Sequence, residues 1–294
     1  MAHCVVEEAE KILDKEYPVL NKGFVRLVDY MGGDERVVQA ARVSYGKGTK
    51  SYREDSALID YLLRHEHTSP FEQVSLTFHI KLPIFVARQW IRHRTAKVNE
   101  ISGRYSIMKD DFYEPELEDI ALQSSDNRQG RSEEALDKGL AEETRDAIRA
   151  GQQKVYAEYK ELIDKGIARE LARINLPLSL YSEWYWQIDL HNLFHFLKLR
   201  LDSHAQKEIR LYAQVLFDIS KKVAPLCCAS FERWVLGAIT FSNEEVEEIK
   251  RRLAANDANN ANNSIGANDA STKSILSDKA LERLEEKLRS GKQL

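Results

Sequence analysis

The chain has 294 residues, 43% of them hydrophobic and 31% charged, which is typical of a globular protein in aqueous solution. Its formal net charge is −4, so we expect no wrapping of duplex nucleic acid, and it contains no apolar run long enough to cross a membrane. Three cysteines without metal-ligand spacing, and a first segment without a secretory signal, indicate a reduced cytoplasmic protein that does not use a cysteine nucleophile.

The first third of the chain combines a charged leader with strands and helices. Residues 1–22 form the leader, with a short helix that ends before Pro18. The clearest strand is 74–82, where apolar and polar residues alternate strictly. The other expected elements are a strand at 23–30, helices at 35–44, 57–65 and 84–94, and a polar loop at 47–54.

The remainder is mostly helical around one further strand. The polar segment at about 117–152 is expected to be a mobile insertion with one surface helix. After it we expect helices at 154–165 and 168–176, a strand at 184–190, and a helical stretch at 193–220 with a break near Asp202. The segment 254–272 is rich in Asn and is expected to be disordered, and 276–288 has the spacing of a short helix.

These patterns predict a single α+β domain with appendages at both ends. Its expected boundaries are a leader at 1–22, the globular domain at 23–250, and an Asn-rich linker with a short helix at 251–294.

The densest cluster of chemically active side chains is RQWIRHRTAKVNEISGRY, residues 88–105. It holds four arginines between apolar residues, and buried arginines need anionic partners. Glu100 alone cannot neutralise them. Arginine forks beside a Ser102-Gly103 turn suit a phosphate monoester, so the residues predict an anion site without identifying the anion.

Two other clusters are weaker. His65 and His67 have a spacing that can hold a metal, but no cysteine or carboxylate stands at ligand spacing. Arg200 and His204 share one helical face. Each is most often an ordinary surface or capping group.

The same residues carry a resemblance to a known family. Arg92-His93-Arg94, seven further residues and then Ser102 form the signature of the flavin-dependent thymidylate synthases. Four other segments resemble the family in its order, namely 65–73, 83–90, 168–181 and 199–209. The resemblance covers roughly residues 20–235 and is specific, because several separate segments match.

This resemblance implies a fold and an activity. The fold is a mostly antiparallel sheet flanked by helices. The activity is reductive methylation of dUMP to dTMP, with methylenetetrahydrofolate as carbon donor and FAD, reduced by NADPH, as hydride source. The resemblance also implies a homotetramer whose active sites are shared between subunits.

Site residues carry over by position. By resemblance, the positions that contact substrate are His67, Gln89, Trp90, Ile91, Arg92, Glu100, Ile101, Ser102, Gly103, Arg104, Arg173 and Arg200. Those that contact the cofactor FAD are Ser69, Glu72, Arg92, His93, Arg94, Asn99, Glu100, Asp189, His195 and His204. Arg200 is the expected catalytic residue, because a fixed cation favours the ionised uracil ring. Ser102 is expected to be a ligand hydroxyl, since no adjacent base would make it a nucleophile.

Two alternatives stay open from the residues alone. One is a metal-dependent nucleotide phosphohydrolase that uses the histidines 65, 67 and 79 with Glu72. The other is a non-enzymatic nucleotide- or RNA-binding module that uses the arginine cluster.

Overall fold

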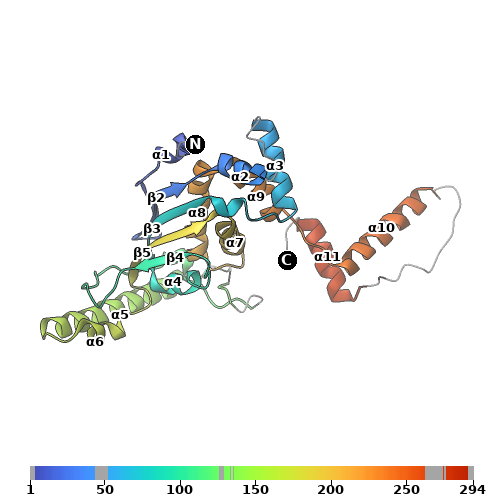
Figure 1. Ribbon diagram of the computed structural model, residues 1–294. Helices are drawn as coiled ribbons and strands as arrows, with labels where there is room; N and C mark the ends of the chain where they lie inside the picture. The colour runs from blue at the N-terminus through green and yellow to red at the C-terminus, as the bar shows by residue number, and fades with distance from the viewer. Residues whose placement is uncertain are drawn as a thin grey trace. The chain divides into compact units, whose positions relative to one another are not determined.

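The computed structural model describes residues 4–43, 52–125, 129–132, 134, 136–261, 274 and 276–290. The part that it describes contains a five-stranded sheet in the order β1-β2-β3-β5-β4, with every neighbouring pair antiparallel. The strands are β1 (Glu16–Val19), β2 (Gly23–Met31), β3 (Ser75–Pro83), β4 (Lys97–Glu100) and β5 (Tyr181–Asp189). The predicted α+β class with an antiparallel sheet is confirmed (Figure 1).

Helices make up most of the rest of the described chain. Before β4 they are α1 (Glu7–Glu10), α2 (Asp34–Arg42), α3 (Tyr52–Arg64) and α4 (Ile84–Trp90), with a 3₁₀ turn η2 (Phe71–Gln73). After β4 they are α5 (Lys138–Asp164), α6 (Arg169–Ala172), α7 (Leu190–Arg200), α8 (Lys207–Val223), α9 (Pro225–Phe231), α10 (Asn243–Ala261) and α11 (Asp278–Ser290). Shorter turns are η3 (Leu117–Asp119), η4 (Arg173–Asn175) and η5 (Glu232–Leu236).

The chain divides into two compact units, residues 1–230 and 231–294. The first unit contains the whole sheet. The second contains α10 and α11, where Lys287 is buried and its Nζ binds both carboxylate oxygens of Glu245, at 2.8 and 2.9 Å. Residues 251–294, separated in the sequence analysis as a linker and short helix, therefore lie within this second unit.

The core lies on one face of the sheet, against α4, α7 and α8 (Figure 1). The strict alternation of β3 explains this arrangement, because Leu76, Phe78 and Ile80 are fully buried while the residues between them are not. Trp90 of α4 packs against Trp186 of β5 with ring centroids 5.2 Å apart. The helices therefore close the apolar face and leave the other face to polar and aromatic side chains.

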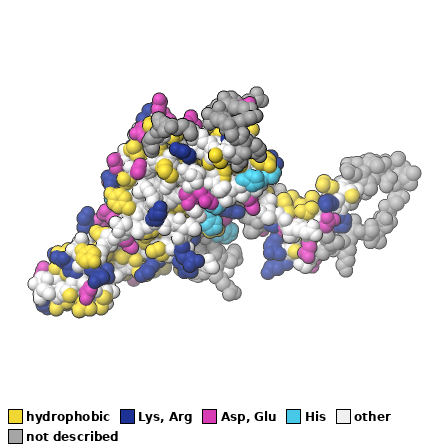
Figure 2. All heavy atoms as spheres, viewed as in Figure 1, with side chains coloured by type: hydrophobic (Ala, Val, Ile, Leu, Met, Phe, Trp, Pro, Cys, Tyr) yellow, Lys and Arg dark blue, Asp and Glu magenta, His cyan; other side chains and the backbone are white. Residues whose placement is uncertain are grey.

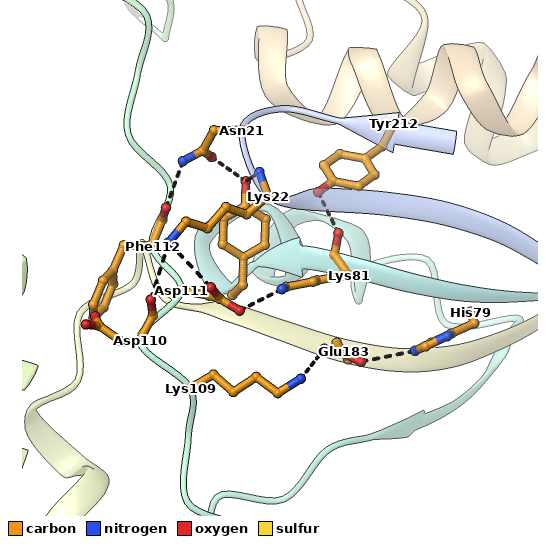
Figure 3. Close-up of polar contacts among 11 residues, drawn as sticks. Asn21, Lys22, His79, Lys81, Lys109, Asp110, Asp111, Phe112, Glu183 and Tyr212 are labelled. Atoms are coloured by element: carbon orange, nitrogen blue, oxygen red, sulfur yellow. Dashed lines mark hydrogen bonds and ion pairs between the residues drawn. The ribbon is translucent and has the colours of Figure 1, made fainter. Parts of the chain in front are cut away.

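On that second face, a loop after β4 is tied to the sheet by charged groups. Asp111 lies between Lys81 and Lys22, at 2.7 and 3.4 Å, and Glu183 binds His79 at 3.3 Å (Figure 3). The two lysines lower the pKa of Asp111, although its burial alone would raise it. This network fixes the chain just beyond the predicted anion-binding turn.

Several sequence expectations need correction at element boundaries. Residues 16–19, expected to precede any strand, form the edge strand β1, and Pro18 is tolerated there because an edge strand leaves N–H positions unpaired. The helix expected at 154–165 begins at Lys138, where Asp137 caps it by accepting from the Leu140 N–H at 3.1 Å. Residues 138–152 of the expected polar insertion are therefore the first part of α5, which is the surface helix expected there.

Other boundaries agree or shift slightly. The strands 23–30, 74–82 and 184–190 are confirmed as β2, β3 and β5, and the break near Asp202 separates α7 from α8. The helix expected at 84–94 ends at Trp90. Most of the loop expected at 47–54 lies outside the described residues, and α3 begins at Tyr52.

The end of the chain contains the expected short helix as α11. Helix α10 runs to Ala261 and so extends into the segment 254–272 that was expected to be disordered. Alanine is the strongest helix former, and three alanines stand between 254 and 258. Residues 262–272 of that segment lie outside the described residues.

Candidate active site

Two cavities open beside each other on the first unit and share Thr95. The arginine cavity, about 720 Å³, is lined by Arg92, His93, Arg94, Thr95, His191, Asn192, His195, Leu199 and Arg200. This lining holds three arginines and no carboxylate. The acidic cavity, about 480 Å³, is lined by Asp29, Tyr30, Met31, Glu72, Ser75, Thr77, Thr95, Lys97, Gln187, Ile188 and Asp189. The two adjoining cavities therefore have opposite electrostatic character.

Arg200, the last residue of α7, is held by groups from the α4 region. Its Nε donates to Nε2 of His93 at 3.1 Å, and its Nη2 donates to the carbonyl of Gln89 at 3.4 Å. Across the residues that the structure describes, no carboxylate forms an ion pair with Arg200. The guanidinium group is half-buried, and this burial lowers its pKa.

His93 is kept neutral mainly by its burial, with the charge of Arg200 adding to the effect. Burial, followed by the charges of Arg200 and His195, lowers the pKa of His93 to about 4. Because Nε2 accepts from Arg200, the proton of the neutral ring is on Nδ1. The pair therefore presents one positive charge to the cavity, located on Arg200.

A tight turn follows β4. The Ser102 carbonyl accepts from the N–H groups of Tyr105 and Ser106, both at 3.0 Å, and the Ser102 Oγ accepts from the N–H of Arg104 at 3.3 Å. Gly103 is buried here, and a Cβ on it would lie 3.0 Å from Cδ of Arg173. The lack of a side chain at Gly103 is thus what lets Arg173 pack on the turn.

The acidic cavity contains two of the expected FAD contacts. Asp189 caps α7 and accepts from the N–H and Nδ2 of Asn192, at 2.9 and 2.6 Å. Glu72 is exposed on η2. Both Asp189 oxygens are therefore already bound by the helix start, which limits this residue to further contacts through its remaining lone pairs.

The structure separates the remaining expected site residues into other places. His67 and Ser69 are exposed after α3, with the His67 ring 5.8 Å from that of Tyr61. His204 binds Asp202 at 2.8 Å and lies outside both cavities. Asn99, Glu100 and Ile101 lie at the exposed end of β4.

Trp90 and its neighbours differ from the expectation. The Trp90 side chain is fully buried in the aromatic core, so any substrate contact from this residue must come from its backbone. Ile91 is exposed, and the side-chain amide of Gln89 donates to the Gln206 side chain.

Within one chain, the expected site residues therefore lie in separate groups. Arg92, His93, Arg94, His195 and Arg200 share one cavity, whereas Ser102, Gly103, Arg104 and Arg173 form a second cluster. Sequence reasoning missed Thr95, His191 and Asn192 as cavity residues. Their positions in the sequence could have indicated them. Thr95 directly follows the arginine signature, and His191 and Asn192 lie in the first turn after Asp189.

The alternative metal enzyme gains no support. Within the described ranges, no group of three or more His, Cys, Asp or Glu side chains could hold a metal ion. Among those same residues, no helix combines the length and apolar composition needed to span a bilayer.

Two family profiles match the sequence. The profile described as thymidylate synthase complementing protein matches residues 26–226. A second, described as the thymidylate synthase ThyX C-terminal domain, matches residues 239–294. The second match covers a segment in which sequence analysis found no functional signal.

The chain is also similar to named relatives. It is 62% identical to the flavin-dependent thymidylate synthase of Treponema denticola, over 96% of this chain and 100% of the relative. It is 55% identical to that of Treponema pallidum, over 100% and 91%, and 55% identical to that of Thermus thermophilus, over 88% and 94%.

Solved structures agree with the fold. A UMP/dUMP methylase, PolB, from Streptomyces cacaoi, bound with 5-Br UMP, matches with a TM-score of 0.67 and 32% identity. The match covers 74% of this chain and 96% of that one. A second structure of the same methylase, with 5-Br dUMP, has the same TM-score of 0.67.

Proposed function

Since this chain belongs to the family of flavin-dependent thymidylate synthases, we propose that its arginine cavity and its Ser102 turn hold the two anionic partners of that reaction. The chain methylates dUMP to dTMP, with methylenetetrahydrofolate as carbon donor and with FAD that NADPH reduces.

The observation that carries the proposal is the charge of the arginine cavity. A lining with three arginines and no carboxylate concentrates positive charge at one place on the surface, and this charge attracts an anion. The pyrophosphate of FAD is such an anion, and Arg92, Arg94 and His195 offer donors to it. The residues therefore fit the flavin cofactor, which when bound supplies the hydride for the reduction.

Arg200 acts on the pyrimidine. Its Nε donates to His93 and its Nη2 to the Gln89 carbonyl, so the orientation of the guanidinium group is fixed and its remaining N–H groups are left for a ligand. A cation held in a fixed orientation stabilises negative charge that develops on the uracil ring. His93 keeps this cation in place without adding a competing charge, because it stays neutral at physiological pH.

The Ser102 turn holds the nucleotide phosphate. Arg173 packs directly on Gly103, and Arg104 is the next residue of the turn. Their forks and the Ser102 hydroxyl are suitable donors to phosphate oxygens. Glu170 lies 3.5 Å from Arg104 in an exposed pair, which is weak enough for a phosphate to displace it.

We also propose a homotetramer with shared active sites. Large apolar side chains around the Ser102 turn are exposed in one chain, with Tyr105 at 75% and Ile174 at 72%. Leu171 and Leu178 extend this patch near α6, and Figure 2 shows hydrophobic side chains along the arm that α5 and α6 form. The Ser102 turn lines neither of the two cavities in a single chain. A second copy of the chain that covers this patch would also bring side chains to the turn and enclose it.

The test separates the two anion sites. We expect Arg94→Ala to weaken FAD binding, measured by flavin absorbance, and Arg173→Ala to raise the KM for dUMP, measured by tritium release from labelled dUMP with NADPH and FAD. Arg88→Ala is the matched control, because Arg88 is exposed and outside both cavities. If Arg94→Ala and Arg173→Ala behave like the control, the assignment of sites is wrong.

The oligomer has its own measurement. Light scattering after size exclusion should give four times the mass of one chain for the native protein. Ile174→Asp should lower that mass, and Val43→Asp, at the exposed end of α2 and away from α5 and α6, should not. A native protein of one-chain mass would exclude the shared site.

A further inference from the structure

The carboxylate of Glu100 is held by a buried serine on the neighbouring strand. Glu100 is the last residue of β4 and pairs with Trp184 of β5. Ser182 lies two residues from Trp184 on the same face of β5, because side chains alternate along a strand. Its side chain is 3% exposed, and its Oγ donates to Oε1 of Glu100 at 2.5 Å.

The backbone adds a second contact at the same point. The N–H of Ile101 donates to the carbonyl of Glu183 at 2.9 Å, so pairing with β5 continues one residue beyond β4. The chain then enters the Ser102 turn. A bond between side chains and a bond between backbones therefore fix the strand end from which the turn begins.

The other end of the turn is fixed independently. Asp111 is bound by Lys22 and Lys81, and Figure 3 shows this network on the sheet beside Glu183. The turn is thus anchored on both sides to β3 and β5. Of these anchors, only the Ser182 hydroxyl acts directly on a side chain expected to contact the substrate.

We propose that Ser182 is a positioning residue for dUMP binding, which acts through Glu100. The hydroxyl occupies one carboxylate oxygen and leaves the other oxygen, in a fixed direction, for a donor group of the nucleotide. A hydrogen bond to a charged group is stronger than a neutral one, and preorganisation lowers the entropy that binding costs. This inference rests on the proposed contact between Glu100 and substrate.

The first experiment is Ser182→Ala in the full-length protein with FAD. We expect the KM for dUMP to rise about tenfold with kcat within about twofold of wild type, since a binding contact is lost in ground state and transition state alike. Ser182→Thr, which keeps the hydroxyl, should restore the KM. If Ser182→Ala does not fold, Ser182→Cys, a poor donor of similar volume, replaces it.

Ser220→Ala is the matched control. Ser220 is also fully buried, but its hydroxyl donates to the Leu216 carbonyl within α8, at 2.7 Å, far from the turn in sequence. The Ser220→Ala substitution removes a buried serine hydroxyl, as Ser182→Ala does. We expect its KM for dUMP to stay at the wild-type value, so a rise equal to that of Ser182→Ala would overturn the inference.

A double-mutant cycle with Glu100→Gln decides how Ser182 acts. We expect Ser182→Ala to have little further effect on KM in the Glu100→Gln background, because the interaction is then already weakened. Additive effects would overturn the inference while leaving the role of Glu100 intact. An unchanged KM in Glu100→Gln would overturn both that role and the inference.

Discussion

Arg131 and Arg200 are both half-buried guanidinium groups of the first unit, but they have opposite surroundings. Arg131 donates to Oε1 of Glu208 at 2.5 Å, and Tyr113 donates to the same oxygen at 2.8 Å. Burial lowers the pKa of Arg131, yet the bond to Glu208 raises it overall, whereas burial alone lowers the pKa of Arg200.

The difference is that the chain neutralises the charge of Arg131 and leaves that of Arg200 without an ion partner among the described residues. Glu208, 3% exposed, compensates Arg131 within the chain and ties the segment before α5 to the start of α8. Within the described ranges, the acceptors of Arg200 are both neutral, namely His93 and the Gln89 carbonyl. A charge that the chain has not neutralised is available to a ligand, so the first pair should determine folding and the second should determine catalysis.

The largest effect should come from breaking the structural pair. Glu208→Ala leaves the Tyr113 hydroxyl without its buried acceptor and leaves Arg131 only its contacts with Asp119, so we expect the free energy of unfolding to fall by about 3 kcal/mol. Urea denaturation measures this. Glu118→Ala, at an exposed carboxylate nearby, is the control and should change little. A loss below about 1 kcal/mol in Glu208→Ala would contradict the structural role.

Breaking the functional cation should affect the rate and leave folding intact. For Arg200→Ala we expect kcat/KM to fall about 10²–10³-fold, as for removal of one preorganised electrostatic group. The free energy of unfolding should not decrease, because no ion partner is left behind. Initial rates of dTMP formation measure the first quantity and urea denaturation the second. Activity within threefold of wild type, at saturating FAD, would remove Arg200 from the mechanism.

Gly103→Ala sharpens the comparison at the second cluster. The new Cβ would lie 3.0 Å from Cδ of Arg173 and 3.2 Å from the Met108 sulfur, so Arg173 must shift. We expect the KM for dUMP to rise about tenfold, about 1.4 kcal/mol, with FAD binding unchanged. Gly151→Ala, inside α5 with open space around it, should instead stabilise the chain by about 0.5–1 kcal/mol.

The smallest expected effect is a pH dependence from His93. Its pKa is lowered from 6.5 in the unfolded chain to about 4 when folded, so the folded state disfavours the proton. This difference contributes about 1 kcal/mol to the free energy of unfolding after solvent screening. The contribution is fully present above pH 6.5 and is lost as the pH falls to about 4. His93→Gln should remove this part of the pH dependence of unfolding. If its curve matches wild type between those pH values, His93 is not the titrating group.

Local pattern predicted the elements that have strong periodicity. The alternation in β3 and the break before α8 were visible because they depend on neighbouring residues. The start of α5 was missed because the first half of this helix is mostly exposed and polar. Such a helix shows little apolar periodicity, which is the signal that predicts a helix from sequence. The strand at Pro18 was missed because proline usually ends a regular element, and only pairing with β2 makes the edge position visible.

The family signature and the separate matching segments determined, from sequence alone, the family and the reaction, because chemistry selects side chains at fixed spacing. Which of those side chains meet was decided only by the fold. His93 and Arg200 stand 107 residues apart, and Glu100 and Ser182 82 apart. Contacts over such separations depend on how strands and helices pack, since no local propensity of the chain specifies them.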